Sequence, residues 1–253
     1  MDLAQWSSVL MVFARVSAFM AVGPLFSLRH VPPLVKAGAG LLAAALIAPL
    51  VRVVPAERLE EFVLVILTEV LVGLALGYAA TLAFQAIRVA GQLVDLETGL
   101  AMADLLDPET GAGITVLGEF FYLLGILVLL QLDGHHGFLR ALADSFETVP
   151  PGVAAWHGGL AQEMAKRFSA MFALAFHLAA PMVAVLVVSD VALALVARTV
   201  PQLNVFMLGF PLKAGLALVV LVLIMPLLAA AFGPAFRLMD QNLALVTYYL
   251  AGR

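Results

Sequence analysis

Long apolar runs, each separated from the next by a short polar interruption, occupy almost the whole sequence. Hydrophobic residues make up 64% of the 253 residues and charged residues 12%, and the mean hydropathy is +1.08. Soluble domains are about half apolar and about a quarter charged. The composition therefore predicts an all-α, polytopic membrane-class protein, because helices satisfy their own backbone hydrogen bonds where water is absent.

No polar linker or hydrophilic block of domain size divides the chain, so residues 1–253 are expected to form one domain. The net charge is −4 and the 13 Lys and Arg residues are scattered, which argues against a nucleic-acid partner. The absence of Cys excludes disulfides and thiolate chemistry. The N-terminus opens with an acid and shows no convincing cleavage site, so the first apolar run is expected to remain in the protein.

The apolar runs predict helices, and one amphipathic helix is expected among them. The runs are residues 9–26, 37–51, 62–87, 114–132, 168–200 and 205–236. Within 133–150, apolar residues recur at spacings of three and four opposite charged ones, which predicts the amphipathic helix. Its expected inward-facing residues are Leu139, Leu142 and Phe146. In the third run, Gly73 and Gly77 have the spacing of small residues that lets another helix approach closely.

Ionisable side chains interrupt several of the apolar runs. They are Arg15, Glu69, Glu119, Asp190 and Lys213. Insertion scales assign each such residue a cost of about 2.5 to 3.5 kcal/mol if it faces lipid at the bilayer centre. Pairing inside a bundle, lining a water path or snorkelling at a helix end would each avoid this cost. Several such residues together favour helices that are surrounded mainly by protein, as in a subunit of a larger assembly.

Residues 99–113, with the sequence GLAMADLLDPETGAG, place glycines, a proline and carboxylates between two apolar runs. No Lys or Arg occurs between Arg88 and Arg140, although cytoplasmic loops usually carry a basic excess. Pro108 and the glycines keep the backbone irregular, and such backbone is not tolerated in contact with lipid. The residues alone leave two interpretations open, an ordinary exposed loop and a loop that lines a pore.

A histidine cluster, Asp133-Gly134-His135-His136-Gly137, follows the fourth apolar run. Adjacent histidines on a helix point about 100° apart, so we expect no metal ion there and expect Asp133 to cap a helix instead. His177, in an apolar run, is expected to pack in the core rather than to relay protons. No catalytic triad, phosphate loop or dinucleotide fingerprint is present, so we expect neither enzyme activity nor a cofactor.

Four separated blocks carry recognisable motifs: residues 14–51, 91–111, 133–150 and 200–218. The last block contains a specific Pro-Gln-x-x-x-Phe-x-x-Gly-x-Pro pattern. In order and spacing, the four blocks resemble the FliR family of flagellar export proteins, whose injectisome counterparts are the SctT-type proteins. The residues that match family motifs are Asp133, Gly134, His135, Pro201, Gln202, Phe206, Gly209 and Pro211.

This resemblance implies a subunit of the type III export gate, in the bacterial inner membrane at the flagellar basal body. FliP-type and FliQ-type subunits would build the gate with it as bent helical hairpins, and FlhB-type and FlhA-type export components would work beside it. Unfolded flagellar subunits would pass through, driven by energy from other components. The resemblance further implies a FliP-like part over residues 1–167 and a FliQ-like helical hairpin with a C-terminal tail over 168–253.

The resemblance also implies that residues 99–113 form a loop that projects into the channel and helps to plug it. The residues expected to form this loop and gate are Gly99, Met102, Leu105, Asp107, Pro108, Gly111 and Gly113. Family members often carry Phe where this chain has Met102 and Leu105, which implies a softer apolar seal.

Three other functions stay open. An injectisome subunit of the SctT type is the nearest alternative. A proton-coupled small-solute transporter could use the acids and histidine of the apolar runs, namely Glu69, His177 and Asp190. A membrane-embedded enzyme would need His135, His136 and a nearby acid.

Overall fold

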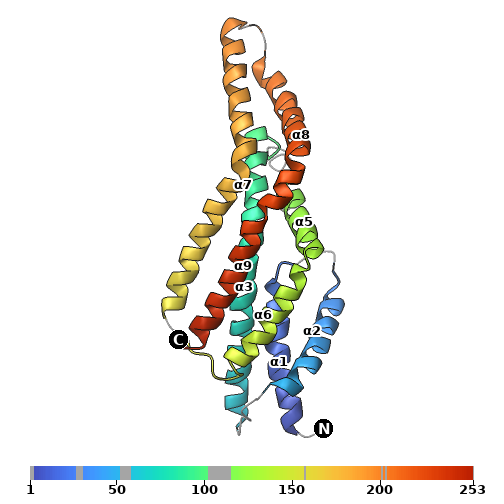
Figure 1. Ribbon diagram of the computed structural model, residues 1–253, viewed down its shortest axis with the longest axis vertical. Coiled ribbons are helices and arrows are strands. Elements are labelled where there is room, and N and C mark those ends of the chain that lie inside the picture. The colour runs from blue at the N-terminus through green and yellow to red at the C-terminus, as the bar shows by residue number, and fades with distance from the viewer. Residues whose placement is uncertain are drawn as a thin grey trace. The chain divides into compact units, whose positions relative to one another are not determined.

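The computed structural model describes residues 3–26, 31–51, 58–101, 115–156, 158–200, 202 and 204–252. Their regular secondary structure is entirely helical, which confirms the predicted all-α class (Figure 1). The helices are α1 (Leu3–Val22), α2 (Pro33–Ile47), the 3-10 turn η1 (Ala48–Leu50), α3 (Leu59–Thr98), α5 (Val116–Gln131), α6 (Gly134–Thr148), α7 (Gly158–Thr199), α8 (Val205–Ala231) and α9 (Gly233–Leu250).

Four helical stretches of the described chain are long and apolar enough to cross a membrane. They are Pro33–Leu50, Leu59–Thr98, Gly158–Thr199 and Met207–Leu250. A fifth arises if α5 and α6, which meet at a 79° bend, count as one broken span. The prediction of a polytopic membrane-class protein is therefore confirmed.

α3 and α7 are much longer than the apolar runs that predicted them. The third run was expected to end at residue 87, but α3 continues to Thr98 and includes the acids at its C-terminal end. Likewise α7 begins at Gly158, ahead of the apolar run at 168. In both cases polar residues extend a helix beyond the part that hydrophobicity marks.

The amphipathic helix predicted over 133–150 is α6, with one error in its inward face. Leu142 and Phe146 are buried as expected, but Leu139 is 51% exposed. Phe138, one residue earlier, is buried instead, and its ring lies 6.2 Å from that of Phe19 on α1. The larger aromatic side chain therefore sets the rotation of α6 about its axis.

The chain divides into two compact units, and α3 contributes residues to both. Unit 1 comprises Met1–Ala83, Leu129–Phe168 and Phe236–Arg253. In unit 1, Gly73 lies so close to α1 that an added Cβ would overlap the carbonyl oxygen of Arg15. The neighbouring Gly77 meets the carbonyl oxygen of Phe19 in the same way, at 2.9 Å. The close helix approach predicted from the glycine spacing is thus confirmed.

Unit 2 comprises Phe84–Val128 and Ser169–Ala235. Its core is formed by side chains of α3, α5, α7 and α8. Fully buried examples are Phe84, Ile87, Phe121, Ala175 and Leu186. Three prolines lie inside its helices, Pro181 in α7 and Pro211 and Pro226 in α8.

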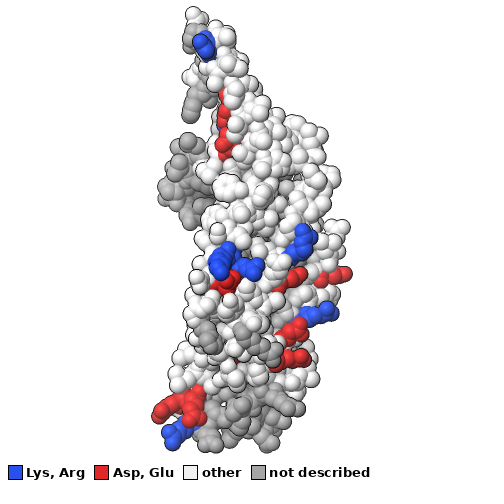
Figure 2. Space-filling model, turned by 60° about the vertical axis from the view of Figure 1, so that its left-hand side comes forward, with Lys and Arg blue, Asp and Glu red and all other residues white. Residues whose placement is uncertain are grey.

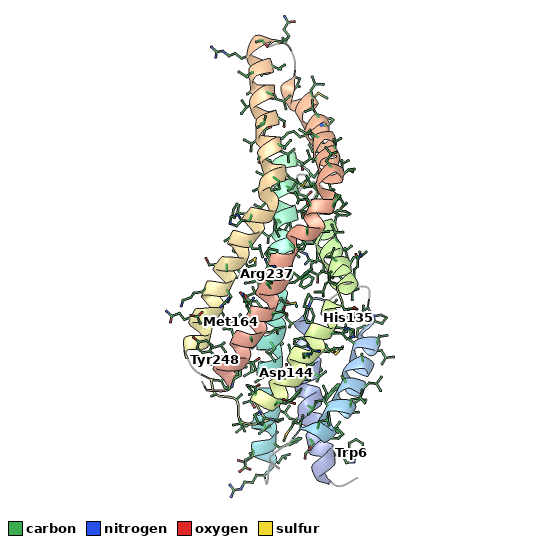
Figure 3. All side chains as sticks on the ribbon, in the orientation of Figure 1. Trp6, His135, Asp144, Met164, Arg237 and Tyr248 are labelled. Carbon is green, nitrogen blue, oxygen red and sulfur yellow. The ribbon has the colours of Figure 1, made fainter. Side chains whose placement is uncertain are left out.

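Large apolar side chains cover much of the exposed surface within each unit. On α8 alone, the exposed ones include Met207, Leu208, Leu212, Leu218, Val222, Leu223 and Leu227. Trp6 on α1 and Tyr248 on α9 likewise project outward, at 55% and 54% exposed (Figure 3). On the face shown in Figure 2, acidic and basic residues cover only a small part of the described surface. Such surfaces favour an apolar or protein environment over water.

We predict that Gly73→Ala destabilises the protein by about 1–3 kcal/mol, because the added methyl group forces α1 and α3 apart. Gly38→Ala on α2 is the matched control, since nothing lies within 4 Å of its added Cβ. The control should be neutral or slightly stabilising. Thermal unfolding of the detergent-purified variants measures both effects, and equal midpoints for Gly73→Ala and the unaltered protein would contradict the close approach.

Candidate functional site

The ionisable residues of the apolar runs are paired in the structure. In unit 1, Nε of Arg15 on α1 lies 2.7 Å from Oε2 of Glu69 on α3, and both side chains are fully buried. A buried ion pair persists only when its remaining donors and acceptors are satisfied as well.

The remaining groups of this pair are satisfied by one end of α6 and the turn after it. Arg15 donates from Nη1 to the carbonyl oxygen of Ser145 and from Nη2 to that of Val149, both at 2.9 Å. Glu69 accepts from the backbone N–H of Gly152 through Oε1, at 3.1 Å. The guanidinium also lies 4.3 Å from the ring centroid of Phe146. A cation at the C-terminal end of α6 is favourable because the helix dipole is negative there.

Unit 2 holds the other charges that the sequence placed in apolar runs. Nζ of Lys213 on α8 lies 2.8 Å from the Asp190 carboxylate on α7 and 4.0 Å from Oε1 of Glu97 on α3. Arg88 on α3 pairs with Glu119 on α5 at 2.9 Å. The structure thus selects pairing within the helix bundle from the three possibilities that the sequence left open.

Only the first three residues of the expected channel segment, 99–101, are described. Gly99 follows α3 with a φ of +80°, and a Cβ there would lie 3.2 Å from the ring of Phe210. Leu100 and Ala101 complete the described part. The other expected gate residues lie outside the described residues, namely Met102, Leu105, Asp107, Pro108, Gly111 and Gly113. Their role stays a prediction.

Asp95 on α3 is a residue whose importance the sequence analysis missed. It lies in the region between Arg88 and Arg140 that contains no Lys or Arg, and it is fully buried. Its Oδ2 accepts hydrogen bonds from the backbone N–H groups of Leu117 and Gly118, at 2.8 and 3.0 Å. Those groups belong to the first turn of α5. Leu117 is 22 residues after Asp95, so no local sequence pattern predicts the contact.

The motif residues Asp133, Gly134 and His135 form the corner between α5 and α6. Asp133 has a φ of 55° and is the one non-glycine residue with positive φ in the described chain. It stands at the N-cap position of α6, but its side chain makes no capping hydrogen bond. The expectation that Asp133 caps the helix is therefore wrong.

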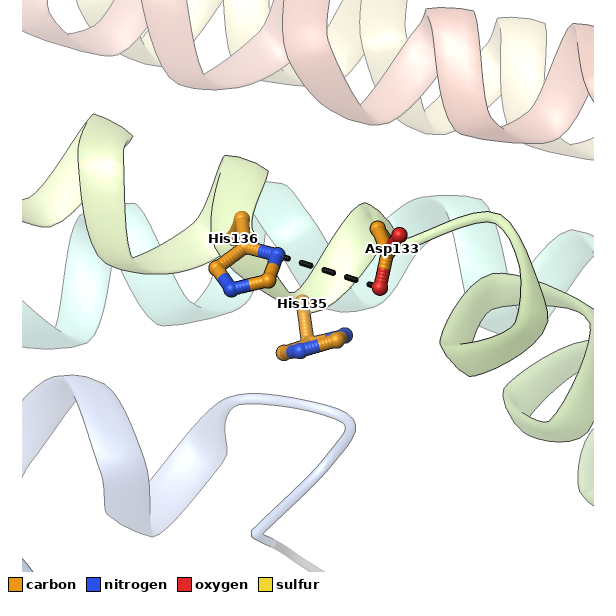
Figure 4. Close-up of side chains that lie close together, drawn as sticks. All are labelled: Asp133, His135 and His136. Atoms are coloured by element: carbon orange, nitrogen blue, oxygen red, sulfur yellow. Dashed lines mark ion pairs between the residues drawn. The ribbon is translucent and has the colours of Figure 1, made fainter.

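The histidine cluster is tighter than the sequence suggested (Figure 4). The rings of His135 and His136 lie 4.2 Å apart at 35°, so the expected divergence of the two side chains is wrong. With Asp133 they place three potential ligand atoms within 4.8 Å of one another. The first turn of α6, however, carries partial positive charge, which disfavours a cation. The absence of a metal stays a prediction.

The Pro-Gln block forms the start of α8. Pro201 lies outside the described residues and Gln202 is exposed in the connection from α7. Phe206 is in the first turn of α8, Gly209 is buried, and Pro211 lies inside the helix. Asn204 caps α8 by accepting from the N–H of Met207 at 3.3 Å. The motif therefore shapes the entry into a helix.

His177 lies on α7 and is exposed within the described chain. The expectation that it packs in the core is therefore wrong for this chain by itself.

These features define a class of protein: an all-helical, membrane-class chain whose internal charges are paired within each unit. The chain belongs to the family of bacterial export proteins, family 1, whose sequence model matches residues 6–239. It is 37% identical to the flagellar biosynthetic protein FliR of Bacillus subtilis (strain 168), over 92% of each chain. It is 32% identical to the protein of the same name from Escherichia coli (strain K12), over 89% of this chain and 88% of the relative. The resemblance found in the four sequence blocks is confirmed.

A relative from another system is also similar. The Yop proteins translocation protein T of Yersinia pestis is 31% identical over 186 residues, which are 71% of this chain and 70% of that protein.

We predict that Arg15→Met lowers the free energy of unfolding by about 3–5 kcal/mol, because it leaves the Glu69 carboxylate buried without its partner. The double variant Arg15→Met with Glu69→Leu should be less damaged than the sum of the two single variants. Lys166→Ala, which removes an exposed ion pair with Glu163, is the control and should change nothing measurable. Unfolding midpoints test this, and strictly additive single effects would show that the buried pair is not coupled.

Proposed function

We propose that the chain is a core subunit of the flagellar type III protein export gate, where it helps to form and to close the channel for unfolded flagellar subunits. The observation that carries this proposal is the family match over residues 6–239, together with flagellar relatives that cover about 90% of the chain. The four motif blocks are spread over the same length.

A flagellar role is favoured over an injectisome role by both identity and coverage. The Bacillus subtilis flagellar protein is 37% identical over 92% of this chain. The Yersinia pestis translocation protein is 31% identical over 71%. The injectisome subunit stays the second candidate, because the Yersinia pestis protein is also more than 30% identical over more than two thirds of each chain.

The proposed surroundings are neighbouring subunits in the bacterial inner membrane, at the flagellar basal body. The exposed apolar side chains of α7 and α8 favour contact with neighbouring subunits over contact with water. The cluster of Lys213, Asp190 and Glu97 is only partly covered by this chain, so protein neighbours suit it better than lipid tails. FliP-type and FliQ-type subunits are the proposed neighbours, with FlhB-type and FlhA-type components beside them.

Within this proposal the chain is a single domain with a FliP-like part over 1–167 and a FliQ-like hairpin and tail over 168–253. It binds no nucleic acid and needs no cofactor, and it performs no enzymatic reaction. Its substrates are unfolded chains in transit. The two compact units of the structure reflect packing and are a different division of the same chain.

The proposed gate is the segment 99–113, with Met102 and Leu105 as its apolar seal. A narrow ring of apolar side chains blocks ions because water leaves such a constriction. The flanking residues Gly99, Pro108 and Gly113 would let the seal move aside for a passing chain. Asp107 and Gly111 complete the proposed loop.

The transporter alternative gains no support from the relatives or from the site. Glu69 and Asp190 are each engaged in an ion pair. In this structure both carboxylates therefore serve to join helices within their units.

We predict that Met102→Gly combined with Leu105→Gly makes the assembled gate leak ions. Deleting residues 101–111 should do the same, because both changes remove the apolar seal. The measurement is potassium leak from vesicles that contain the complex purified with its FliP-type and FliQ-type partners. Val153→Gly, an exposed apolar residue in another loop, is the control. Vesicles that stay as tight as those with the unaltered complex would show that the segment is not the seal.

We also predict that the chain is poorly stable without its partners, since its exposed apolar faces and partly covered charges then lack protein neighbours. Co-expression with the FliP-type and FliQ-type subunits should raise the yield of folded protein. Purification of the chain alone as a stable monomer, equal in yield to the co-expressed protein, would contradict this.

A further inference from the structure

A groove between α6 and α9, both in unit 1, carries polar side chains that the export role does not use. Its volume is about 540 Å³, within the usual range of small-molecule sites. We propose that it binds the headgroup of a zwitterionic phospholipid, with phosphoethanolamine as the chemistry that its side chains fit. The polar residues that line it are Arg140, Asp144, Thr148, Asp240, Thr247 and Tyr248.

The groove follows one stripe of residues on each helix. On α6 the lining residues begin at Gly137 and end at Thr148, and on α9 they begin at Asp240 and end at Tyr248. Residues three and four apart share one face of a helix. The helices are close at the first end, because a Cβ on Gly137 would lie 4.0 Å from Oδ1 of Asp240. At about 1.5 Å per residue, the groove is roughly 16 Å long, which accommodates a headgroup and the start of its acyl chains.

The charged side chains of the groove have no partner in their own chain. Arg140, Asp144 and Asp240 are exposed, and none of them makes an ion pair or a hydrogen bond within the described residues. Arg140 and Asp144 are four residues apart, but a base that precedes an acid is the weaker order for such a pair. Since α6 and α9 belong to candidate membrane spans, these charges need a polar partner, and it has to come from outside the described chain.

A ligand that carries both signs of charge satisfies this set of side chains at once. The guanidinium of Arg140 offers a planar fork of N–H donors, which binds phosphate oxygens in pairs. The hydroxyl groups of Thr148 and Tyr248 can donate to further phosphate oxygens. The carboxylates of Asp144 and Asp240 accept hydrogen bonds from an ammonium group. Phosphoethanolamine carries a phosphate and an ammonium joined by a short ethyl linker.

The same side chains disfavour other common headgroups. One guanidinium and two carboxylates give the groove a net charge of −1, which repels an anionic headgroup such as phosphoglycerol. Phosphocholine is zwitterionic, but its methylated nitrogen has no N–H to donate to a carboxylate. The groove therefore suits a primary ammonium beside a phosphate.

Aromatic residues at one end of the groove suit the headgroup level of a membrane. Tyr248 and Trp156 are both exposed (Figure 3 labels Tyr248). The segment that carries Trp156 is held against the end of α9, because the N–H of Ala155 donates to the carbonyl oxygen of Leu250 at 2.9 Å. Tyr and Trp are enriched where a membrane meets water. Leu243, which also lines the groove, offers apolar contact to the start of an acyl chain.

The test uses the full chain, co-expressed with its FliP-type and FliQ-type subunits and stripped of lipid in detergent. The complex is titrated separately with dioleoyl-phosphatidylethanolamine, dioleoyl-phosphatidylcholine and dioleoyl-phosphatidylglycerol, and native mass spectrometry measures the bound lipid. Phosphatidylethanolamine should fill one site per copy of this chain about tenfold more tightly than the other two, since each of those loses a charge-assisted hydrogen bond or meets repulsion. Equal affinity for the three lipids would overturn the inference.

Variants of the groove test which side chains hold the headgroup. Arg140→Gln and Asp240→Asn should each weaken the binding of phosphatidylethanolamine about tenfold. Arg237→Gln on α9 is the matched control, because Arg237 is exposed but does not line the groove, and its binding should be unchanged. Unchanged binding in both groove variants would overturn the inference. If a groove variant does not assemble, the lipid preference of the unaltered complex decides.

Two soluble competitors identify the chemistry that is recognised. Glycerophosphoethanolamine, which is the headgroup without acyl chains, should displace the lipid, whereas inorganic phosphate at the same concentration should not. Equal displacement by phosphate would indicate a simple anion site, and no displacement by the headgroup would indicate recognition of the acyl chains. Either result would overturn the inference, as would a groove that binds none of the three lipids because a neighbouring subunit fills it. None of these results bears on the export role, which the vesicle leak tests separately.

Discussion

The cost of an unpaired charge inside an apolar helix determines which helices of this chain lie together. Arg15 can enter α1 only because Glu69 faces it from α3, and both then draw the end of α6 and the turn after it into the same contact. In unit 2, Lys213 and Asp190 impose the same condition on α7 and α8. Glycines at the crossing points, such as Gly73 and Gly91, then let the backbones approach to contact distance. Ion pairs thus determine which helices pack together, and glycines determine how closely those helices approach.

Much of the helical framework could be predicted from the sequence, because the signals that define it are local. Apolar runs marked the helices, and the Gly73/Gly77 spacing announced a close approach. The residues alone also indicated that these charges avoid lipid, but they left pairing, a water path and snorkelling open. The partners did not follow from the residues, because Arg15 and Glu69 are 54 residues apart and several acids could have served equally well.

Several of the errors come from distant contacts that override a local preference. Asp133 has the residue type of a helix cap but makes no capping bond, while Asp95 caps a helix that begins far along the chain. Phe138 displaces Leu139 from the inward face of α6 because an aromatic ring from α1 is there to receive it. Of the proposed gate residues, only Gly99 is among those described, so the seal rests on the family resemblance and on physical argument.

The prolines inside α8 have a consequence for whatever surrounds that helix. Pro211 and Pro226 lack the N–H that would bond the carbonyl oxygens of Met207 and Val222, one turn earlier. Met207 and Val222 are about 70% exposed, so their own chain does not cover this part of the helix surface. Hydrocarbon tails have no donor to offer an unbonded carbonyl, whereas serine, threonine or asparagine on an adjoining polypeptide does. The two prolines thus give α8 positions at which a hydroxyl or amide group of a neighbouring chain can donate to the helix backbone.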